Sequence, residues 1–382
     1  MVKKYVKLLG FWLAKILRLC YNIGMKIIHI SNVRLGANLG TGFDNMPSEK
    51  ARIRGQELLE SFYGVLSYAK DNGVKTVLVT GDLFDNTAVV QSLKKEVMDN
   101  IAKSKVEVLY LRGARDAKFD VEPEKPKNLR VIDVDNNWTS IELQDNVVVT
   151  GIDLFRATTK DNLYDRLLLE KKKYNIVALY GAEDFVQWEL LKAKAVDFVA
   201  LGGRVAPDLK EQKIDSRAKY GYAGGLDILS VHESNTEHGF FVLDIVAGKM
   251  TRTFVPVAKR KYETVTVDIS GAETTKALDS AVSKKLAKVS KDNILTIELV
   301  GQYKFDLQKQ IGVLQNKLNA DYFSVVIEDK SVLDFSELAQ MNDISLRTEF
   351  VKTALESGLG QGQIDKIVEY GLRALTGETI EI

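Results

Sequence analysis

Four short segments that carry arginine or aspartate follow stretches typical of buried strands. Each contains glycine as well, and they are HISNVRLGANL (29–39), VTGDLFDN (79–86), YLRGARDAKF (110–119) and VALGGRVAPDL (199–209). In α/β proteins the ends of neighbouring strands open onto one face, where ligands bind. Two kinds of chemistry are open to these residues. Aspartate can ligate a divalent cation, and arginine can bind phosphate oxygens through its planar guanidinium group.

The elements around these segments alternate between strands and helices, which predicts an α/β layered fold. Apolar runs predict buried strands at 26–30, 76–80, 106–111, 176–180 and 197–202. Helical periodicity indicates helices at 49–71, 87–103, 160–173 and 187–195. The stretches 129–152 and 219–256 look antiparallel, so we expect mixed rather than purely parallel sheets.

Around residues 257–262 the polar sequence AKRKYE lacks periodicity, which predicts a domain boundary there. Beyond it the order strand, helix, strand, helix, strand suits a small α+β domain. We therefore expect a basic amphipathic leader at 1–24, a main α/β domain at 25–258, an α+β domain at 262–332 and a helical tail at 333–382.

Composition bounds the class of protein. The chain has 382 residues, with 53 Lys and Arg against 52 Asp and Glu, a net charge of +1. This balance argues against a protein that coats nucleic acid through bulk charge. The single cysteine, Cys20, excludes an internal disulfide framework and predicts a cytoplasmic location.

Residues 1–24 contain five basic residues and no acid, with leucines at helical spacing. Their longest uncharged run, 8–14, is much shorter than the ~20 residues that span a bilayer. Two interpretations stay open. The segment lies on an anionic membrane surface, which makes the protein peripheral to the membrane, or it is an artefact of start-site choice and the protein begins at Met25.

From Met25 onward the chain resembles the calcineurin-like metallophosphoesterases, and among them the SbcD-type DNA repair exonucleases of the YhaO-like branch. The segments quoted above, with GDLFD at 81–85, Arg52 and Arg54 at a helix start and the small second domain, carry the resemblance. It implies a four-layer α/β/β/α sandwich, an α+β capping domain and C-terminal helices.

The family holds two Mn²⁺ or similar ions through the motifs D-x-H, GD, GNH, a lone His and GHxH, to cleave phosphodiesters. The matching positions here are Asn32-Val33-Arg34, Gly81-Asp82, Gly113-Ala114-Arg115, Tyr180 and Gly202-Gly203-Arg204-Val205. Asp82 alone remains a strong ligand, with Asn32 as a weak one. Arginine has no lone pair to donate to a metal. We therefore expect no catalytic residue at these degenerate positions and no metal cofactor.

The arginines admit two interpretations. Arg34, Arg112, Arg115 and Arg204 would emerge on one strand-end face and form a metal-free phosphate pocket. Alternatively they pair with Asp82, Asp85 and Asp116 and fill the space that metals would take, an interpretation that we favour slightly. Asp85 can also cap a helix that begins near Thr87.

The three histidines do not restore a metal site. His29 lies on the first predicted strand, where a core or sheet-edge position is expected. His232 and His238 lie in the polar stretch VHESNTEHGF, where solvated side chains are expected.

Three functions follow, in order of preference. The first is a catalytically inactive homologue, a pseudoenzyme, that binds DNA ends with an SMC-like ATPase docked on the C-terminal helices. The resemblance further implies a homodimer formed through helices 49–71 and 87–103. The second is a divergent phosphoesterase with one metal at Asp82, helped by Asn32, Asp116, Glu183 or Asp184. The third is a membrane-surface adaptor anchored by residues 1–24.

Overall fold

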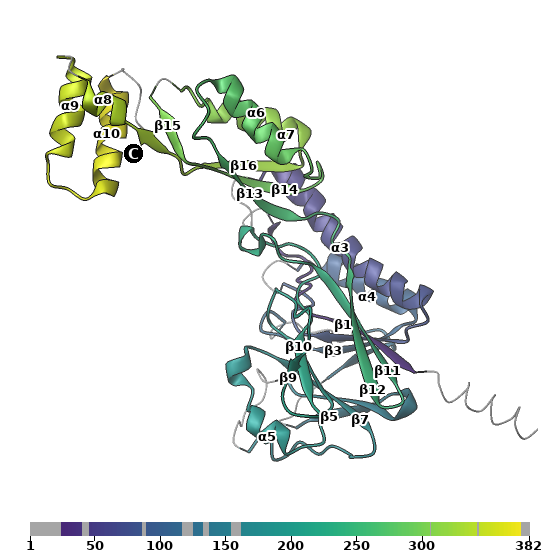
Figure 1. Cartoon of the computed structure of the whole chain (residues 1–382). Helices are drawn as coiled ribbons and strands as arrows, with labels where there is room; N and C mark the ends of the chain where they lie inside the picture. The colour runs from purple at the N-terminus through teal and green to yellow at the C-terminus, as the bar shows by residue number, and fades with distance from the viewer. Residues whose placement is uncertain are drawn as a thin grey trace, which may run out of the picture. The chain divides into compact units, whose positions relative to one another are not determined.

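The computed structural model describes residues 24–39, 46–85, 89–116, 125–132, 137–153, 162–305, 307–341 and 344–375 (Figure 1). The predicted leader therefore lies outside the described residues except for Gly24. The chain divides into two compact units, and the boundary along the sequence falls between Lys259 and Arg260. We call them the N-terminal unit and the C-terminal unit and describe each by itself.

Two six-stranded sheets form the centre of the N-terminal unit. The first has the order β12-β11-β1-β2-β3-β4, with β1 (Met25–Ile30), β2 (Thr76–Thr80), β3 (Glu107–Leu111), β4 (Leu129–Val131), β11 (Gly239–Val246) and β12 (Lys249–Pro256). The second has the order β5-β6-β7-β8-β10-β9, with β5 (Thr139–Glu142), β6 (Val147–Gly151), β7 (Tyr174–Tyr180), β8 (Phe198–Gly202), β9 (Gln212–Lys213) and β10 (Lys219–Tyr222). Strands β1 to β4 are parallel, whereas β11 is antiparallel to β1. The predicted mixture of parallel and antiparallel pairing is confirmed.

Helices α3 (Ser48–Asp71) and α4 (Gln91–Ser104) cover the outer face of the first sheet. Strand side chains alternate between two cores, as the pleat requires. Ile28 and Ile30 pack with α3 and α4, whereas Ile27 packs between the sheets with Phe198 of β8. Because each sheet face is apolar, both cores exclude water.

The outer face of the second sheet carries a thinner layer. It consists of α5 (Trp188–Lys192), the short turn η2 (Glu183–Phe185) and the turns at 162–166, packed on Val177 and Val199. The predicted four-layer α/β/β/α sandwich is thus confirmed. Two further short helical turns are η1 (Gln144–Asn146) and η3 (Val231–Glu233).

Two local predictions in this unit are wrong. The described part of 160–173 forms turns rather than a helix. The indole Nε1 of Trp138 donates to the carbonyl oxygen of Leu163 at 2.8 Å, which takes an acceptor that a helix would use, and Leu168 is 82% exposed. Asp85 does not cap α4, since that helix begins at Gln91 without a side-chain cap.

The C-terminal unit has the predicted strand and helix order. Three parallel strands, β13 (Tyr262–Asp268), β14 (Ile294–Val300) and β16 (Ser324–Asp329), are joined through α6 (Thr275–Leu286) and α7 (Ile311–Asp321). A small sheet of β15 (Gln302–Lys304) and β17 (Val332–Asp334) precedes α8 (Ser336–Gln340), α9 (Leu346–Leu355) and α10 (Gln361–Leu375). Val351 and Val368 of the last helices share one core with Leu278 and Ile297. Among the described residues, no helix is both long enough and apolar enough for a bilayer crossing.

Candidate functional site

The loops after β1 and β2 run side by side past the ends of their strands. The amide of Asn32 donates to the carbonyl of Gly81 at 3.1 Å, and the amide of Arg34 donates to the carbonyl of Asp82 at 2.8 Å. The loops after β3, β7 and β8 join them through the contacts described below. The strand-end face that the sequence predicts is therefore present in the N-terminal unit.

The backbone of this face is strained at three residues that have side chains. Asn32, Arg34 and Asp82 have φ values of 50°, 52° and 54°, in the left-handed region that few residues other than glycine adopt. Such strain costs about 1–3 kcal/mol at each position and clusters at functional sites. These three positions make this face a candidate functional site.

Both carboxylate oxygens of Asp82 already have protein donors. The Tyr180 hydroxyl donates to Oδ2 at 2.7 Å, and the Arg115 backbone amide donates to Oδ1 at 3.0 Å. Burial raises the pKa of Asp82, while these two hydrogen bonds act in the opposite direction. Asp82 is therefore placed as an acceptor inside the protein, with one donor to each of its carboxylate oxygens.

The ring of Tyr180 packs against glycines of three loops, namely Gly81, Gly113 and Gly203. A Cβ atom at Gly81 would lie 2.0 Å from ring atom Cδ2, and one at Gly113 would lie 2.6 Å from Cε2. Both distances are impossible contacts, so these positions require glycine for as long as the ring lies here. Burial and the nearby Asp82 raise the pKa of Tyr180, which keeps its hydroxyl a donor.

Asp85 forms ion pairs with two arginines of the face, Arg34 and Arg115. Nη2 of Arg34 lies 2.9 Å from Oδ2 of Asp85, and Nη1 of Arg115 lies 3.5 Å from the same atom. The Arg34 side chain is 21% exposed and that of Arg115 is 42% exposed, against 5% for Asp85. The close and more buried Arg34 pair is the stronger of the two, because exposed pairs are weakened by solvent.

Asp116 binds backbone rather than arginine. Its carboxylate accepts hydrogen bonds from the amides of Leu83 at 3.2 Å, Phe84 at 2.9 Å and Gly113 at 3.0 Å. Burial raises the pKa of Asp116 to about 7, against the opposing effect of these hydrogen bonds. Its role is to fasten the loop after β2 to the loop after β3.

Three further positions that the sequence analysis matched to the family motifs are Asn32, Ala114 and Val205. Oδ1 of Asn32 accepts from the Ser31 hydroxyl at 2.6 Å and from the amide of Gly203 at 3.0 Å. Ala114 is exposed, and Val205 contributes its carbonyl to the amide of Gly225 at 2.8 Å. Asn32 therefore ties the loop after β1 to the loop after β8.

Arg112 and Arg204 do not join Arg34 and Arg115. Arg112 is buried, and its Nε lies 3.9 Å from Oδ2 of Asp153. Arg204 contacts Glu183 at 3.3 Å and also Asp208, and its guanidinium lies 4.1 Å from the centre of the Tyr222 ring. Each of the four arginines thus has a carboxylate partner within the described ranges, and Arg34 and Arg115 share theirs.

The histidines follow the sequence prediction with one exception. His29 is buried in the core, with Nε2 2.9 Å from the Thr80 hydroxyl, and burial lowers its pKa. His232 is exposed, as expected. His238 was expected in solvent, but it is only 3% exposed because the chain turns inward there to begin β11. Its Nε2 lies 3.8 Å from Oε2 of Glu233.

Sequence reasoning also missed a buried ion pair close to these loops. Arg54 of α3 is fully buried and donates to Glu57 at 2.7 Å and to Asp227 at 2.5 Å. Asp227 also accepts from the Ser61 hydroxyl at 3.0 Å. The available signal was an arginine at a position of α3 that the helical periodicity assigns to the apolar face.

The donor set does not fit a two-metal centre. Within the described ranges, no group of three or more His, Cys, Asp or Glu side chains is placed to hold a metal ion. Asp82 is engaged by Tyr180 and Arg115, and Asp85 is engaged by Arg34. Two guanidinium groups would also repel a dication at this face.

Comparison with known proteins finds similarity to solved structures only. No family model matches the chain, and no curated protein matches it. Among solved structures, a crystal structure of a dimetal phosphatase from Danio rerio is similar at 9% sequence identity and a TM-score of 0.42, covering 62% of this chain and 96% of that chain. At this level of similarity the comparison does not bear on activity.

Proposed function

We propose that this chain is a non-hydrolysing relative of the SbcD/YhaO-type exonucleases, which acts at DNA ends by binding. One observation carries the proposal. The carboxylates that a phosphodiesterase would offer to metal ions are occupied by side chains and backbone of the protein itself: Asp82 by Tyr180 and Arg115, and Asp85 by Arg34.

Electrostatics supports the loss of cleavage. Asp82 and Asp85 are balanced by the guanidinium groups of Arg34 and Arg115 within the same face. A pair of dications would add four positive charges beside two that cannot be removed by deprotonation. Binding two metals would therefore require both ion pairs to break, which would free one carboxylate only, that of Asp85.

A protein partner is supported by the last helices of the C-terminal unit. Ile344 is 98% exposed and Leu346 is 71% exposed, and Leu359, Ile367 and Tyr370 are exposed on the same helical hairpin and its connection. Contiguous patches of exposed apolar side chains mark protein interaction sites, and we propose that these side chains contribute to one. The motif resemblance assigns this surface to an SMC-like ATPase, and it assigns α3 and α4 to a homodimer contact.

The test separates binding from cleavage in one preparation. Purified full-length protein is analysed for bound metal and then incubated with linear duplex and single-stranded DNA in Mn²⁺ or in EDTA. We expect no stoichiometric metal, no cleavage in Mn²⁺, and DNA binding that persists in EDTA. Two bound Mn²⁺ ions with nuclease turnover would refute the proposal, and absence of DNA binding under both conditions would remove its DNA part.

A one-metal phosphoesterase is the second candidate, and the structure leaves it few ligands. Asp116 accepts three backbone amides, and Glu183 contacts Arg204 and the Tyr220 hydroxyl. Mn²⁺-dependent hydrolysis of bis(4-nitrophenyl) phosphate by the wild-type protein, lost in Asp82→Asn, would establish this candidate instead.

A further inference from the structure

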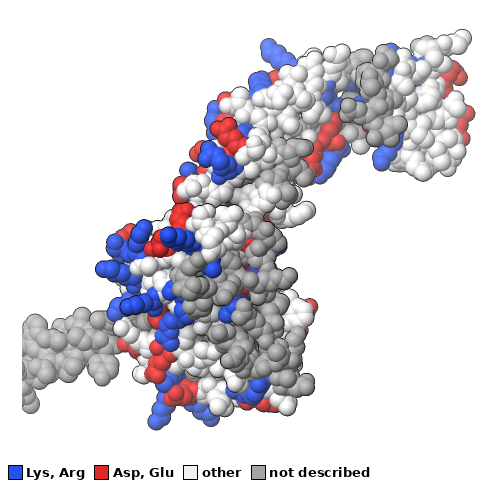
Figure 2. Space-filling view, turned by 180° about the vertical axis from the view of Figure 1, so that it is seen from behind, with Lys and Arg blue, Asp and Glu red and all other residues white. Residues whose placement is uncertain are grey.

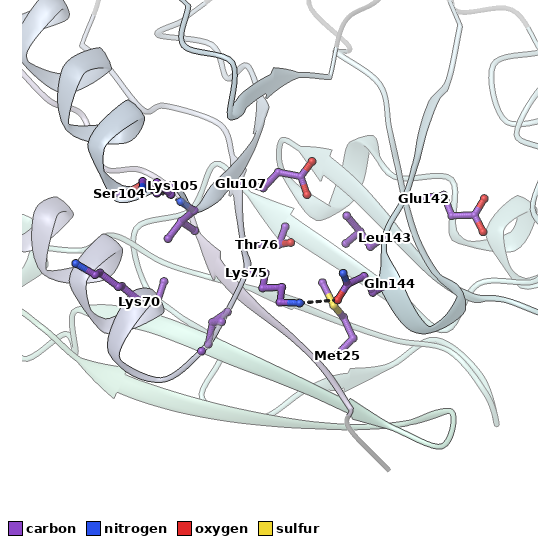
Figure 3. A pocket seen from close by; sticks show the side chains of 14 residues that line it. Met25, Lys70, Lys75, Thr76, Ser104, Lys105, Glu107, Glu142, Leu143 and Gln144 are labelled. Atoms are coloured by element: carbon purple, nitrogen blue, oxygen red, sulfur yellow. Dashed lines mark hydrogen bonds between the residues drawn. The ribbon is translucent and has the colours of Figure 1, made fainter. Parts of the chain in front are cut away.

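A hollow of about 680 Å³ lies at the end of the N-terminal unit opposite the strand-end face (Figure 3). The first residues of β1, β2 and β3, namely Met25, Thr76 and Glu107, line it. The ends of α3 and α4 contribute Lys70 and Lys105. Because it is formed by the opposite ends of the same strands, the hollow is separate from Asp82 and Tyr180.

Three lysines around this hollow have no carboxylate partner among the residues that the structure describes. Lys75 donates to the Gln144 side chain at 3.0 Å, a neutral acceptor (Figure 3). Within the described part of the chain, no ion pair is formed by Lys70, Lys75 or Lys105. The two acids of the lining are used elsewhere, since Glu107 pairs with Arg130 at 3.1 Å and Glu142 pairs with Lys173 at 3.1 Å.

Helix dipoles account for only part of this positive charge. Lys70 lies in the last turn of α3 and Lys105 is the C-terminal capping residue of α4. Each helix end carries the equivalent of about half a negative charge. Two helix ends therefore offset about one of the three lysines, and the hollow keeps an excess of about two positive charges.

The excess extends beyond the hollow at the same end of the sandwich. Lys249 begins β12 at the hairpin that pairs with the start of β1, and Lys171 and Lys172 precede β7. Asp71 and Asp145 are the opposing acids without an ion pair among the described residues. Figure 2 shows Lys and Arg side chains gathered on the side of the N-terminal unit that α3 and α4 form.

The sequence that leads into β1 has the same charge. Residues 1–24 contain five basic residues and no acid, together with several leucines, isoleucines and a tryptophan. They connect directly to Met25, which lines the hollow. Basic and apolar residues combined in this way are typical of segments that lie on anionic membranes.

We propose that this end of the N-terminal unit docks onto an anionic phospholipid bilayer, with Lys70, Lys75 and Lys105 around the headgroup phosphates. The lining contains neither arginine nor an aromatic side chain, the residues with which proteins bind nucleic-acid backbones and stack bases. Its floor is instead apolar, with Val74, Val106 and Leu143. The proposal is independent of what the strand-end face binds.

Vesicle co-sedimentation of the full-length protein tests this surface. The vesicles are phosphatidylcholine alone or phosphatidylcholine with 30% phosphatidylglycerol. We expect binding to the anionic vesicles only, weakening as salt rises, because surface charges are screened over about 8 Å at physiological ionic strength. The variant Lys70→Gln/Lys75→Gln/Lys105→Gln should bind about 100-fold more weakly, at about fivefold per lysine.

A matched control removes the same charge elsewhere. Lys276, Lys284 and Lys288 are exposed on or beside α6 of the C-terminal unit, and their triple change to Gln should leave vesicle binding unchanged. Circular dichroism and thermal unfolding confirm that both triple variants fold. Equal vesicle binding by the two variants, or no binding to anionic vesicles by the wild type, would overturn the proposal. Loss of DNA binding, rather than vesicle binding, in the Lys70/Lys75/Lys105 variant would assign the surface to nucleic acid and equally overturn it.

Discussion

The phenolic hydroxyl of Tyr180, at the end of β7, donates a 2.7 Å hydrogen bond to the carboxylate of Asp82, 98 residues earlier in the chain. A neutral aromatic side chain therefore meets the one carboxylate that the sequence analysis predicts as a strong metal ligand. The ring fits against Gly81 and Gly113, whose missing side chains leave the space that it fills. This contact joins the two sheets at the strand-end face and buries the carboxylate of Asp82.

Changing Tyr180 to Phe should destabilise the protein without disturbing its packing. Asp82 is nearly fully buried, so loss of the hydroxyl leaves a carboxylate oxygen without its donor. A hydrogen bond to a charged group contributes about 1.5–3 kcal/mol, and the free energy of unfolding should fall by about that amount. Urea unfolding at pH 7 measures the change.

The control for this change is Tyr220→Phe, which removes the same atom from an accessible pair. The Tyr220 hydroxyl donates to Glu183 at 3.1 Å, and the Glu183 side chain is 40% exposed. Water replaces that donor, so the loss should stay below about 1 kcal/mol. Equal losses in the two variants would show that the Tyr180 contact has no special role.

Arg34 and Arg115 share Asp85 but should contribute unequally. Arg34→Ala removes the 2.9 Å contact of the more buried side chain and leaves Asp85 with a weak partner, which should cost about 1–3 kcal/mol. Arg115→Ala removes a 3.5 Å contact of a largely accessible side chain and should cost less than about 1 kcal/mol. Denaturant unfolding of both variants gives the order, and a larger loss for Arg115→Ala would contradict this ranking.

Arg54 should be the most sensitive of the described arginines near this face. Its side chain is fully buried between Glu57 and Asp227, and Arg54→Met would leave both acids in the interior with reduced compensation. Breaking such a buried pair from one side costs about 3–5 kcal/mol. Arg52→Met, on the exposed side of the same helix turn, should change the free energy of unfolding by less than about 0.5 kcal/mol. Thermal and urea unfolding distinguish the two, and similar small effects would refute the assigned role.

Much of the fold could be predicted because local patterns set it. The apolar runs at 26–30, 76–80 and 197–202 became β1, β2 and β8 with shifts of at most one residue, since buried parallel strands are apolar on both faces. The predicted helix at 49–71 became α3 for the same kind of reason, an apolar stripe at helical spacing. The prediction of a helix at 160–173 was wrong because the indole of Trp138, distant in sequence, binds the carbonyl oxygen of Leu163.

The sequence predicted which residues of the site share a face, but not which side chains pair with one another. Strand ends placed Arg34, Asp82 and Arg115 on one face, as the structure shows, but spacing could not choose between an open phosphate pocket and internal pairing. The choice depended on contacts between distant segments. Asp82 accepts hydrogen bonds from a tyrosine hydroxyl and a backbone amide rather than from a guanidinium. Asp116 accepts hydrogen bonds from three backbone amides. Arg112 and Arg204 turned to Asp153 and Glu183, which the strand-end pattern does not reveal.

His238 should make stability fall in mild acid. Burial lowers the pKa of His238 to about 4, against the smaller opposing effect of the Asp227 carboxylate. Arg54 also lowers that pKa and Glu237 raises it, while Glu233 lies 3.8 Å from Nε2. In the unfolded chain the imidazole has a pKa near 6.5. The unfolded state therefore binds the proton first, and stability that is complete above about pH 6.5 is lost as the pH falls towards 4.

The expected size of this effect is about 2–3 kcal/mol between pH 7 and pH 4.5. Other groups titrate in the same range, and Asp116, whose pKa is raised, acts in the opposite direction. The informative quantity is therefore the difference between the wild type and His238→Gln, each unfolded in urea at both pH values. The variant should be less stable at pH 7 but should lose about 2–3 kcal/mol less on acidification. Parallel losses in the two proteins would show that His238 is not the group that takes up the proton.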